Sequence, residues 1–164
     1  MITHPDDCNQ TSLLSDRGEV LGIAQRAMIS QADTFFVASM HPVRGVDASH
    51  RGGNPGFVSI VDDQILQIPD YSGNSMFNTL GNFTANPRAG LIFLNFESAR
   101  TLQLTGRAEI LYDVDHTEEE TGGTNRYWKF EIDRWIQISH APQLDWSFLD
   151  YSPYNLPVRN SSTE

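Results

Sequence analysis

The clearest alternation of polar and apolar residues along this chain covers residues 101–111, TLQLTGRAEIL. Successive side chains of a β-strand point to opposite faces of a sheet, so a period of two predicts a strand that buries one face. The polar face of this strand carries Thr101, Gln103, Thr105, Arg107 and Glu109. We therefore expect a half-buried strand whose polar face is open to water or to a ligand.

Five further segments are predicted to be strands, because they are rich in β-branched and aromatic residues or alternate in the same way. These segments are residues 34–40, 56–61, 64–68, 89–96 and 128–138. Only Asp62 and Asp63 separate the second segment from the third, which favours a tight antiparallel hairpin. Residues 43–53 follow the His41-Pro42 turn and are expected to form a loop.

A helical period begins after residues 1–14, which we expect to be an irregular lead-in. In residues 15–32, apolar side chains recur at helical intervals, and Ser15 or Asp16 is the expected N-cap. This pattern predicts a helix that covers the core.

A second helix is expected to start near Asn74 and to end before Pro87. Its apolar positions Met76, Leu80 and Phe83 recur at i, i+4 and i+7, which gives one packed face. Its polar side chains fall together on another face, and they are Ser75, Asn78 and Asn82. Capping or surface exposure explains any one asparagine, whereas several on one side favour a binding face. An anion fits near the helix start, because free N–H groups and the positive end of the helix dipole lie there.

The predicted elements indicate one mainly β domain. About six strands with two helices, which do not alternate as in βαβ units, favour a small antiparallel barrel with helices packed outside and disfavour a Rossmann sheet. We expect a single domain over residues 15–158, followed by a tail of residues 159–164. Residues 113–124 are acidic and glycine-containing, and we interpret them as a solvated loop or a frayed helix rather than a metal site.

Charge and composition narrow the possible partners. The chain has 11 basic and 21 acidic residues, a formal charge of −10, which disfavours binding to nucleic acid and to anionic membranes. Lys129 is the single lysine, so arginine is the expected cation for any anionic ligand. Cys8 is the single cysteine, which excludes an intramolecular disulfide and a cysteine-rich metal site. No apolar run approaches the roughly 20 residues of a membrane span, and the lead-in lacks signal-peptide features, so we expect a cytoplasmic protein.

Two other motifs were weighed for chemistry. Residues 51–56, RGGNPG, lack the order of a P-loop and run into a predicted strand, so a turn with unusual backbone angles is the simpler interpretation. Ser49-His50 does not form a nucleophile and base pair, because adjacent side chains rarely face each other and no G-x-S-x-G motif is present. The histidines show no metal-ligand spacing, so we predict no metal.

Four motifs together resemble a known family. They are D-x-SHRGG-x-PGFV at residues 47–58, PDYSGN at 69–74, NPR at 86–88 and L-x-L-x-GRA at 102–108. The chain is similar to the pyridoxamine 5'-phosphate oxidase-like family of FMN-binding split barrels, in particular to its branch of predicted flavin-nucleotide-binding proteins. The resemblance covers residues 32–112 well and the remainder loosely. It implies a six-stranded split barrel that forms a homodimer, with one FMN in each of two clefts between the subunits.

The resemblance also implies where FMN binds. A strand from His50 through Val58 would line the isoalloxazine ring, residues 71–75 with Asn78 would hold the phosphate and ribityl chain, and Gln103 would reach the flavin of the partner subunit. The candidate FMN-binding residues are His50, Arg51, Gly56, Phe57, Val58, Asp70, Tyr71, Ser72, Gly73, Asn74, Ser75, Asn78, Asn82 and Gln103. Relatives commonly place Arg or Lys where this chain has Asn78. The phosphate is therefore left to helix amides and Arg51.

The functional hypothesis is an FMN-dependent oxidoreductase of unknown substrate, with no catalytic acid or base assigned. Residues 146–154, WSFLDYSPY, do not match the Arg- and Trp-containing C-terminal motif of true pyridoxamine phosphate oxidases, so that activity is not expected. A non-catalytic module that stores or senses flavin, or transfers electrons with a small-molecule or protein partner, is the alternative. A cleft that binds another phosphorylated or planar ligand, or a purely structural protein, ranks below these.

Overall fold

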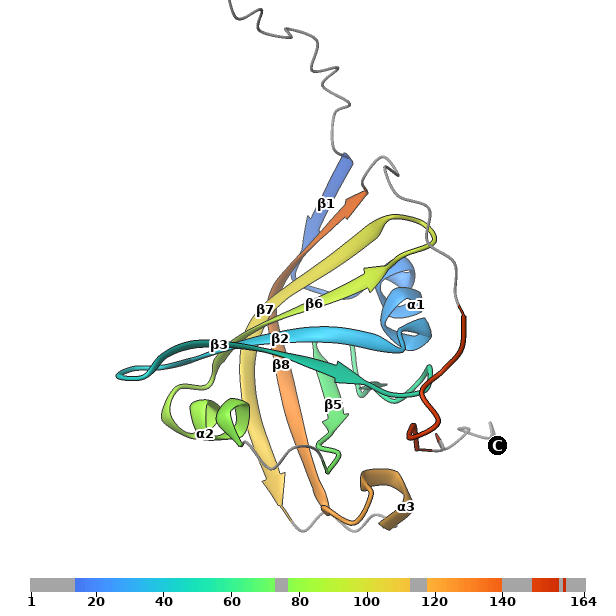
Figure 1. Ribbon diagram of the computed structural model, residues 1–164. Coiled ribbons are helices and arrows are strands. Elements are labelled where there is room, and N and C mark those ends of the chain that lie inside the picture. The colour runs from blue at the N-terminus through green and yellow to red at the C-terminus, as the bar shows by residue number, and fades with distance from the viewer. Residues whose placement is uncertain (1–13, 73–76, 113–117, 140–148, 157, 159–164) are drawn as a thin grey trace, which may run out of the picture.

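Antiparallel β-strands make up most of the computed structural model, which describes residues 14–72, 77–112, 118–139, 149–156 and 158 (Figure 1). The strands in the described ranges are β1 (Leu14–Gly18), β2 (Thr34–His41), β3 (Gly45–Gly52), β4 (Ser59–Ile60), β5 (Ile65–Pro69), β6 (Arg88–Asn95), β7 (Arg100–Tyr112) and β8 (Arg126–Ser139). The helices in these ranges are α1 (Ile23–Gln31), α2 (Asn78–Ala85) and α3 (Glu118–Thr121).

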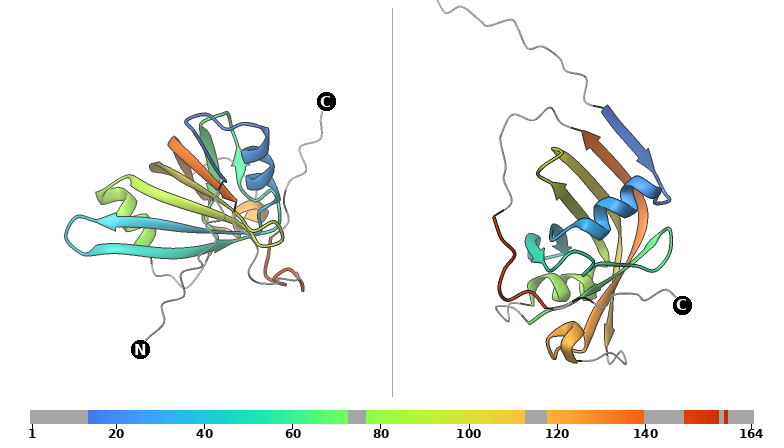
Figure 2. Two further views of the ribbon diagram at one scale, coloured as in Figure 1. Left: turned by 90° about the horizontal axis from the view of Figure 1, so that it is seen from above. Right: turned by 90° about the vertical axis from the view of Figure 1, so that its right-hand side faces the viewer.

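The strands form one sheet in the order β3-β2-β6-β7-β8-β5-β4, and β1 also pairs with β8. On one side β8 pairs with β7 along its length. On its other side it pairs with β5 through residues 127–131 and with β1 through residues 135–139. The sheet therefore divides along β8, and Figure 2 shows its strands curving around α1 and α2.

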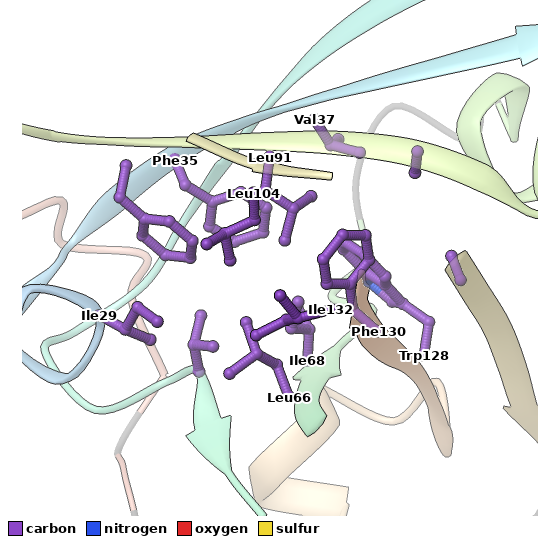
Figure 3. Packing of buried hydrophobic residues seen from close by; sticks show 14 of the residues in the cluster. Ile29, Phe35, Val37, Leu66, Ile68, Leu91, Leu104, Trp128, Phe130 and Ile132 are labelled. Atoms are coloured by element: carbon purple, nitrogen blue, oxygen red, sulfur yellow. The ribbon is translucent and has the colours of Figure 1, made fainter. Parts of the chain in front are cut away.

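Alternation along the strands gives the sheet two faces. The inner face carries the core residues, including Phe35 on β2 and Leu102 and Leu104 on β7, all almost fully buried. Figure 3 shows side chains from α1, β2, β5, β6, β7 and β8 meeting in this core. The opposite, outer face is formed by the intervening residues, such as Phe36 and Gln103. Both longer helices pack on the inner face, because their buried residues join the same core.

The core is rich in stacked aromatic rings. The ring centroids of Phe35 and Phe93 lie 5.0 Å apart, and those of Phe83 and Trp128 lie 5.2 Å apart. Aromatic pairs at such distances contribute beyond the area they bury. Phe83 thereby anchors α2 to β8. The helix also lies against β2 and β3.

The structure confirms the predicted class, a mainly β split barrel with flanking helices, although it has eight described strands rather than six. The strands expected at residues 34–40, 64–68, 89–96, 101–111 and 128–138 are all present. The predicted hairpin is also present, because β4 pairs with β5 in antiparallel register. Its first strand is shorter than expected, since a turn precedes Ser59.

The loop predicted for residues 43–53 is wrong, because residues 45–52 form β3 and pair with β2 from His41↔Gly45 to Thr34↔Gly52. The pattern hid this strand because its inner face is polar: Asp47, Ser49 and Arg51 are half-buried and alternate with exposed residues. Period two was present, but with its faces reversed: the apolar residues Val46 and Ala48 are exposed, and the polar residues face inward.

The first predicted helix begins too early. Residues 14–18 form β1, and α1 starts at Ile23 after Gly22, whose N–H donates to Gln25 Oε1 at 3.2 Å. Neither Ser15 nor Asp16 is therefore a helix cap. Residues 14–18 pair with β8, and this pairing determines their conformation despite the helical spacing of the apolar residues that follow.

The second helix was predicted to begin near Asn74, but α2 begins at Asn78, after Phe77. Asn74 itself lies outside the described residues. The predicted end before Pro87 is confirmed, because the Asn86 N–H donates to Asn82 O at 2.7 Å in the last turn. Within the described ranges, no helix is long and apolar enough to cross a membrane.

A bulge between β7 and β8 requires glycine at position 106. Thr105 pairs with Arg134 whereas Gly106 pairs with Ile132, so β8 has one extra residue. A Cβ on Gly106 would lie 2.0 Å from Glu131 O. No side chain can occupy that space unless the two backbones separate.

We predict that Gly106→Ala lowers the free energy of unfolding by about 2 kcal/mol or more, because the new methyl forces apart the longest strand pair. Gly90→Ala is the matched control, since its Cβ would meet Leu104 O at an ordinary 3.7 Å. Urea unfolding of both variants measures the difference. Equal stabilities would contradict the role assigned to Gly106.

Candidate functional site

The inner face of β3 meets the first turn of α2 through a group of polar side chains. Ser49 Oγ donates to Asp47 Oδ2 at 3.1 Å, and Thr79 Oγ1 lies 3.3 Å from Asp47 Oδ2 and 3.1 Å from Ser49 Oγ. Thr79 is buried, so these bonds are shielded from water. They fix the start of α2 on β3.

Arg51 is the next inner-face residue of β3, directly opposite Phe35 of β2. Its side chain is half-buried, and its Nε is one of three buried side-chain atoms of the described residues without a hydrogen-bond partner. A buried donor without a partner costs about 1–3 kcal/mol. Such a donor on a guanidinium suits a carboxylate or phosphate group, which can accept from it.

The start of α2 is the second feature of this side of the sheet. Phe77 is the N-cap residue, it makes no side-chain cap hydrogen bond, and the first turn of the eight-residue helix contains no acidic residue. Asn78 is exposed in that turn. The first N–H groups of α2 are therefore not capped by the Phe77 side chain.

Asp70 is buried and holds an ion pair with Arg126 across the β5–β8 pair. Arg126 donates to Asp70 Oδ2 through Nε at 3.0 Å, and its terminal nitrogen lies 2.9 Å from the same oxygen. The Arg126 guanidinium also lies over the ring of Phe77, 5.3 Å from its centroid. The carboxylate of Asp70 is therefore engaged within the protein, and Arg126 contacts residues on both sides of segment 73–76.

Tyr71 stacks on Phe57, with ring centroids 6.4 Å apart. Burial raises the pKa of the Tyr71 phenol above its ordinary value. The phenol is thus neutral, a hydrogen-bond donor and acceptor, throughout the physiological range. The side chains of Phe57 and Val58 are buried in the core, so only their backbone groups remain for a ligand.

The glycines near this site are explained by packing. Gly56 has a positive φ of 91°, and a Cβ there would lie 3.3 Å from Val158. A Cβ on Gly53 would lie 2.5 Å from the ring of Phe57. The strand expected to run from His50 through Val58 is therefore interrupted after Gly52 by a tight turn, in which the Phe57 N–H donates to Asn54 O at 3.0 Å.

The polar face predicted for α2 is wrong for Asn82. Its side chain is 5% exposed and donates through Nδ2 to Ser39 Oγ at 2.9 Å, so it belongs to the packed face. The helical spacing could not show that β2 supplies a buried hydroxyl at this point. Ser72 is exposed, whereas Gly73, Asn74 and Ser75 lie outside the described residues.

His50 and Gln103 lie on the outer face. His50 Nε2 is 2.8 Å from Thr34 Oγ1 at the end of the β2–β3 pair. Gln103 is exposed in the middle of β7, flanked by Ile92 of β6 and Ile136 of β8. Arg51 lies on the inner side of the sheet opposite Phe35, whose ring stacks on Phe57, which in turn stacks on Tyr71. Gln103 lies on the opposite side of the sheet.

A hollow of about 530 Å³ surrounds Gln103 on the outer face. Arg17 of β1 and Arg134 of β8 line it, and the sequence pattern singled out neither residue. The sequence pattern also did not single out Thr79 or Arg126 as a site residue. A strict period of two places Arg134 on the same face as Phe130 and Ile132, and only the bulge after Ile132 turns it outward. Arg17 lay in a segment predicted to be helical. Among the described residues, no three His, Cys, Asp or Glu side chains gather as a metal site.

Comparison with known proteins places this geometry in a family. A family model described as pyridoxamine 5'-phosphate oxidase matches residues 21–139. No curated protein matched in a sequence search.

Solved structures share the fold at low identity. A candidate pyridoxamine 5'-phosphate oxidase from Lactobacillus delbrueckii has a TM-score of 0.56 at 14% identity, covering 72% of this chain and 94% of that one. HupZ from Group A Streptococcus has a TM-score of 0.54 at 13% identity, covering 70% and 91%. A FAD-binding protein from Mesorhizobium loti has a TM-score of 0.50 at 13% identity, covering 78% and 99%. Because the family model matches well over half of this chain, the chain belongs to the pyridoxamine 5'-phosphate oxidase-like family.

Proposed function

We propose that the protein binds FMN and acts as an FMN-dependent oxidoreductase, with a substrate other than pyridoxamine phosphate. The family assignment supports a role of this type. The Mesorhizobium loti protein of similar fold is a FAD-binding protein, so the fold is compatible with a flavin. When bound, FMN would supply the redox chemistry, and the chain would bind and orient it.

The unpartnered Nε of Arg51 carries this proposal. FMN differs from riboflavin by a phosphate, which needs a positive counter-charge or several N–H donors. Arg51 offers the positive charge. The start of α2, which the Phe77 side chain does not cap, offers N–H donors. The phosphate therefore fits between β3 and α2, where Asp47, Ser49 and Thr79 hold the two elements together.

Tyr71 lies on the same side of the sheet and stacks on Phe57. Its raised pKa keeps the phenol protonated, so it can donate to a ligand oxygen or nitrogen without carrying a charge. Because the Asp70 carboxylate is paired with Arg126, it is not assigned as a base.

The proposal includes a homodimer, because one protomer presents Arg51 and Gln103 on opposite faces. The outer face exposes apolar side chains that a second copy would cover: Phe36 is 39% exposed, Met40 44% and Val46 81%. Met40 and Val46 are direct cross-strand neighbours, so they form one apolar area. A second copy that covers this apolar area would also lie on the side of the sheet that carries Gln103.

A non-catalytic flavin-binding module is the second candidate. One observation favours it: on the described inner side, Asp47 accepts from Ser49, Asp70 is engaged by Arg126 and Tyr71 is neutral, so none of the three is assigned as a base. Flavin storage, sensing or electron transfer requires no such group.

The first test is the absorbance spectrum of the purified protein and its affinity for FMN. We expect flavin absorbance, and we expect Arg51→Ala to weaken FMN binding by about tenfold or more, because one charge-assisted hydrogen bond is lost. Riboflavin affinity should be unchanged. Arg100→Ala, an exposed arginine on β7, is the control.

Equal loss of FMN and riboflavin would remove the phosphate role of Arg51. A colourless protein whose thermal midpoint does not rise with FMN would contradict both flavin hypotheses, since a ligand of the folded state must stabilise it. If FMN binds but pyridine nucleotides, deazaflavins and quinones react with it no faster than with free flavin, the non-catalytic module is supported.

The second test concerns the dimer. We expect sedimentation analysis to show a dimer, and we expect Val46→Glu to shift it to monomer, because a charge would be buried at the centre of the apolar area. Ile23→Glu is the matched control, since Ile23 is 90% exposed on α1, away from the outer face. A monomeric wild-type protein would contradict the two-subunit site.

A further inference from the structure

The hollow on the outer face is built where β1, β7 and β8 lie side by side (Figure 1). Its volume is about 530 Å³, within the range of small-molecule sites. Gln103, Ile136 and Arg17 occupy one row across the three strands, because Gln103 pairs with Ile136 and Ile136 with Arg17. Arg134 and Thr105 form the next row.

The side chains that line this hollow carry more positive than negative charge. Arg17 and Arg134 are exposed, and neither forms an ion pair with any residue that the structure describes. Glu19 is the single carboxylate among the lining residues. The whole chain has 21 acidic and 11 basic residues, so a hollow with two arginines and one carboxylate has the opposite charge balance from the chain. Planar guanidinium groups suit an oxyanion, which accepts from both.

The backbone around the hollow is fixed by contacts between β1 and β8. β1 is closely seated on β8, because a Cβ on Gly18 would lie 2.7 Å from the indole of Trp135. Trp135 Nε1 donates to Val20 O at 3.0 Å and so fastens the chain just after β1. Arg134 directly follows the bulged residue Asp133, and bulges commonly re-aim neighbouring side chains. The hollow thus joins chain segments that are more than a hundred residues apart.

The remaining lining is neutral or apolar. Ile136 lies between the rows of polar residues, while Gln103 and Thr105 provide hydrogen-bonding groups without charge. A ligand that fits this lining has an oxyanion at one end and a neutral, partly apolar body at the other.

We propose that the Arg17–Arg134 hollow binds the phosphate or carboxylate group of a second ligand, the substrate or electron partner that lies beside the flavin. This inference rests on the proposed function for the position of the flavin, because Gln103 links the hollow to the cleft of the other protomer. The anion site itself requires only Arg17 and Arg134.

The test is calorimetric titration of the full-length protein, loaded with FMN, using inorganic pyrophosphate and, separately, tricarballylate. We expect at least one of these probes to bind, and we expect R17Q/R134Q to weaken it by about tenfold or more, because two charge-assisted contacts are lost. R100Q/R107Q is the matched control: it removes the same charge from exposed positions of β7 outside the hollow. The probe that binds more tightly identifies a phosphate or a carboxylate ligand.

FMN affinity, measured by absorbance for the same variants, separates this inference from the proposed function. R17Q/R134Q should leave FMN binding within about twofold of wild type, since phosphate recognition is assigned to Arg51. Absence of probe binding, or equal losses in both double variants, would overturn the proposal. A loss of FMN affinity in R17Q/R134Q would also overturn it, because the arginines would then hold the cofactor. If FMN never binds but a probe does, the anion site stands and the proposed function fails.

Discussion

The pairing of β7 with β8 determines which residues of this protein face the core and which remain available for ligands. It is the longest strand pair in the described structure, and the bulge at Gly106 adjusts its register midway. A slip of one residue would turn Leu102 and Leu104 outward and bury Gln103. The close approach of Gly106 to Glu131 O blocks a side chain at the bulge. Because β8 also pairs with both β1 and β5, the outer hollow and the inner core both depend on this register.

Local pattern was sufficient for the strands that bury an apolar face. β7 and β8 were predictable because a period of two joined apolar and polar residues, and β2 and β6 because they are rich in β-branched and aromatic or other apolar residues. β3 was not, since Asp47, Ser49 and Arg51 face inward and are satisfied or shielded only in the folded protein. β1 was missed because its strand character comes from pairing with residues 135–139, more than a hundred positions away.

The candidate site was predictable in part for the same reason. The motif around Arg51 and Tyr71 was evident in the sequence, but the partners that define the site are remote. Arg126 reaches Asp70 across 56 positions, and Asn82 reaches Ser39 across 43. Contacts within the protein explain the glycines at 53 and 56, because a Cβ at either position would crowd Phe57 or Val158. The glycines are therefore weaker evidence for a ligand site than the sequence alone suggests. The unpartnered Nε of Arg51 is the stronger evidence.

Net charge constrains how two copies could meet. Each protomer carries a formal charge of −10, so like charges oppose association at long range. A stable dimer must then rest on short-range apolar contact, and the outer face offers it at Phe36, Met40 and Val46. The same face carries Arg17 and Arg134, which form no ion pair with the described residues and lower the negative potential of this face. Two arginines that form no ion pair with the described residues can thus reduce self-repulsion on the outer face and retain a positive hollow for an anionic ligand.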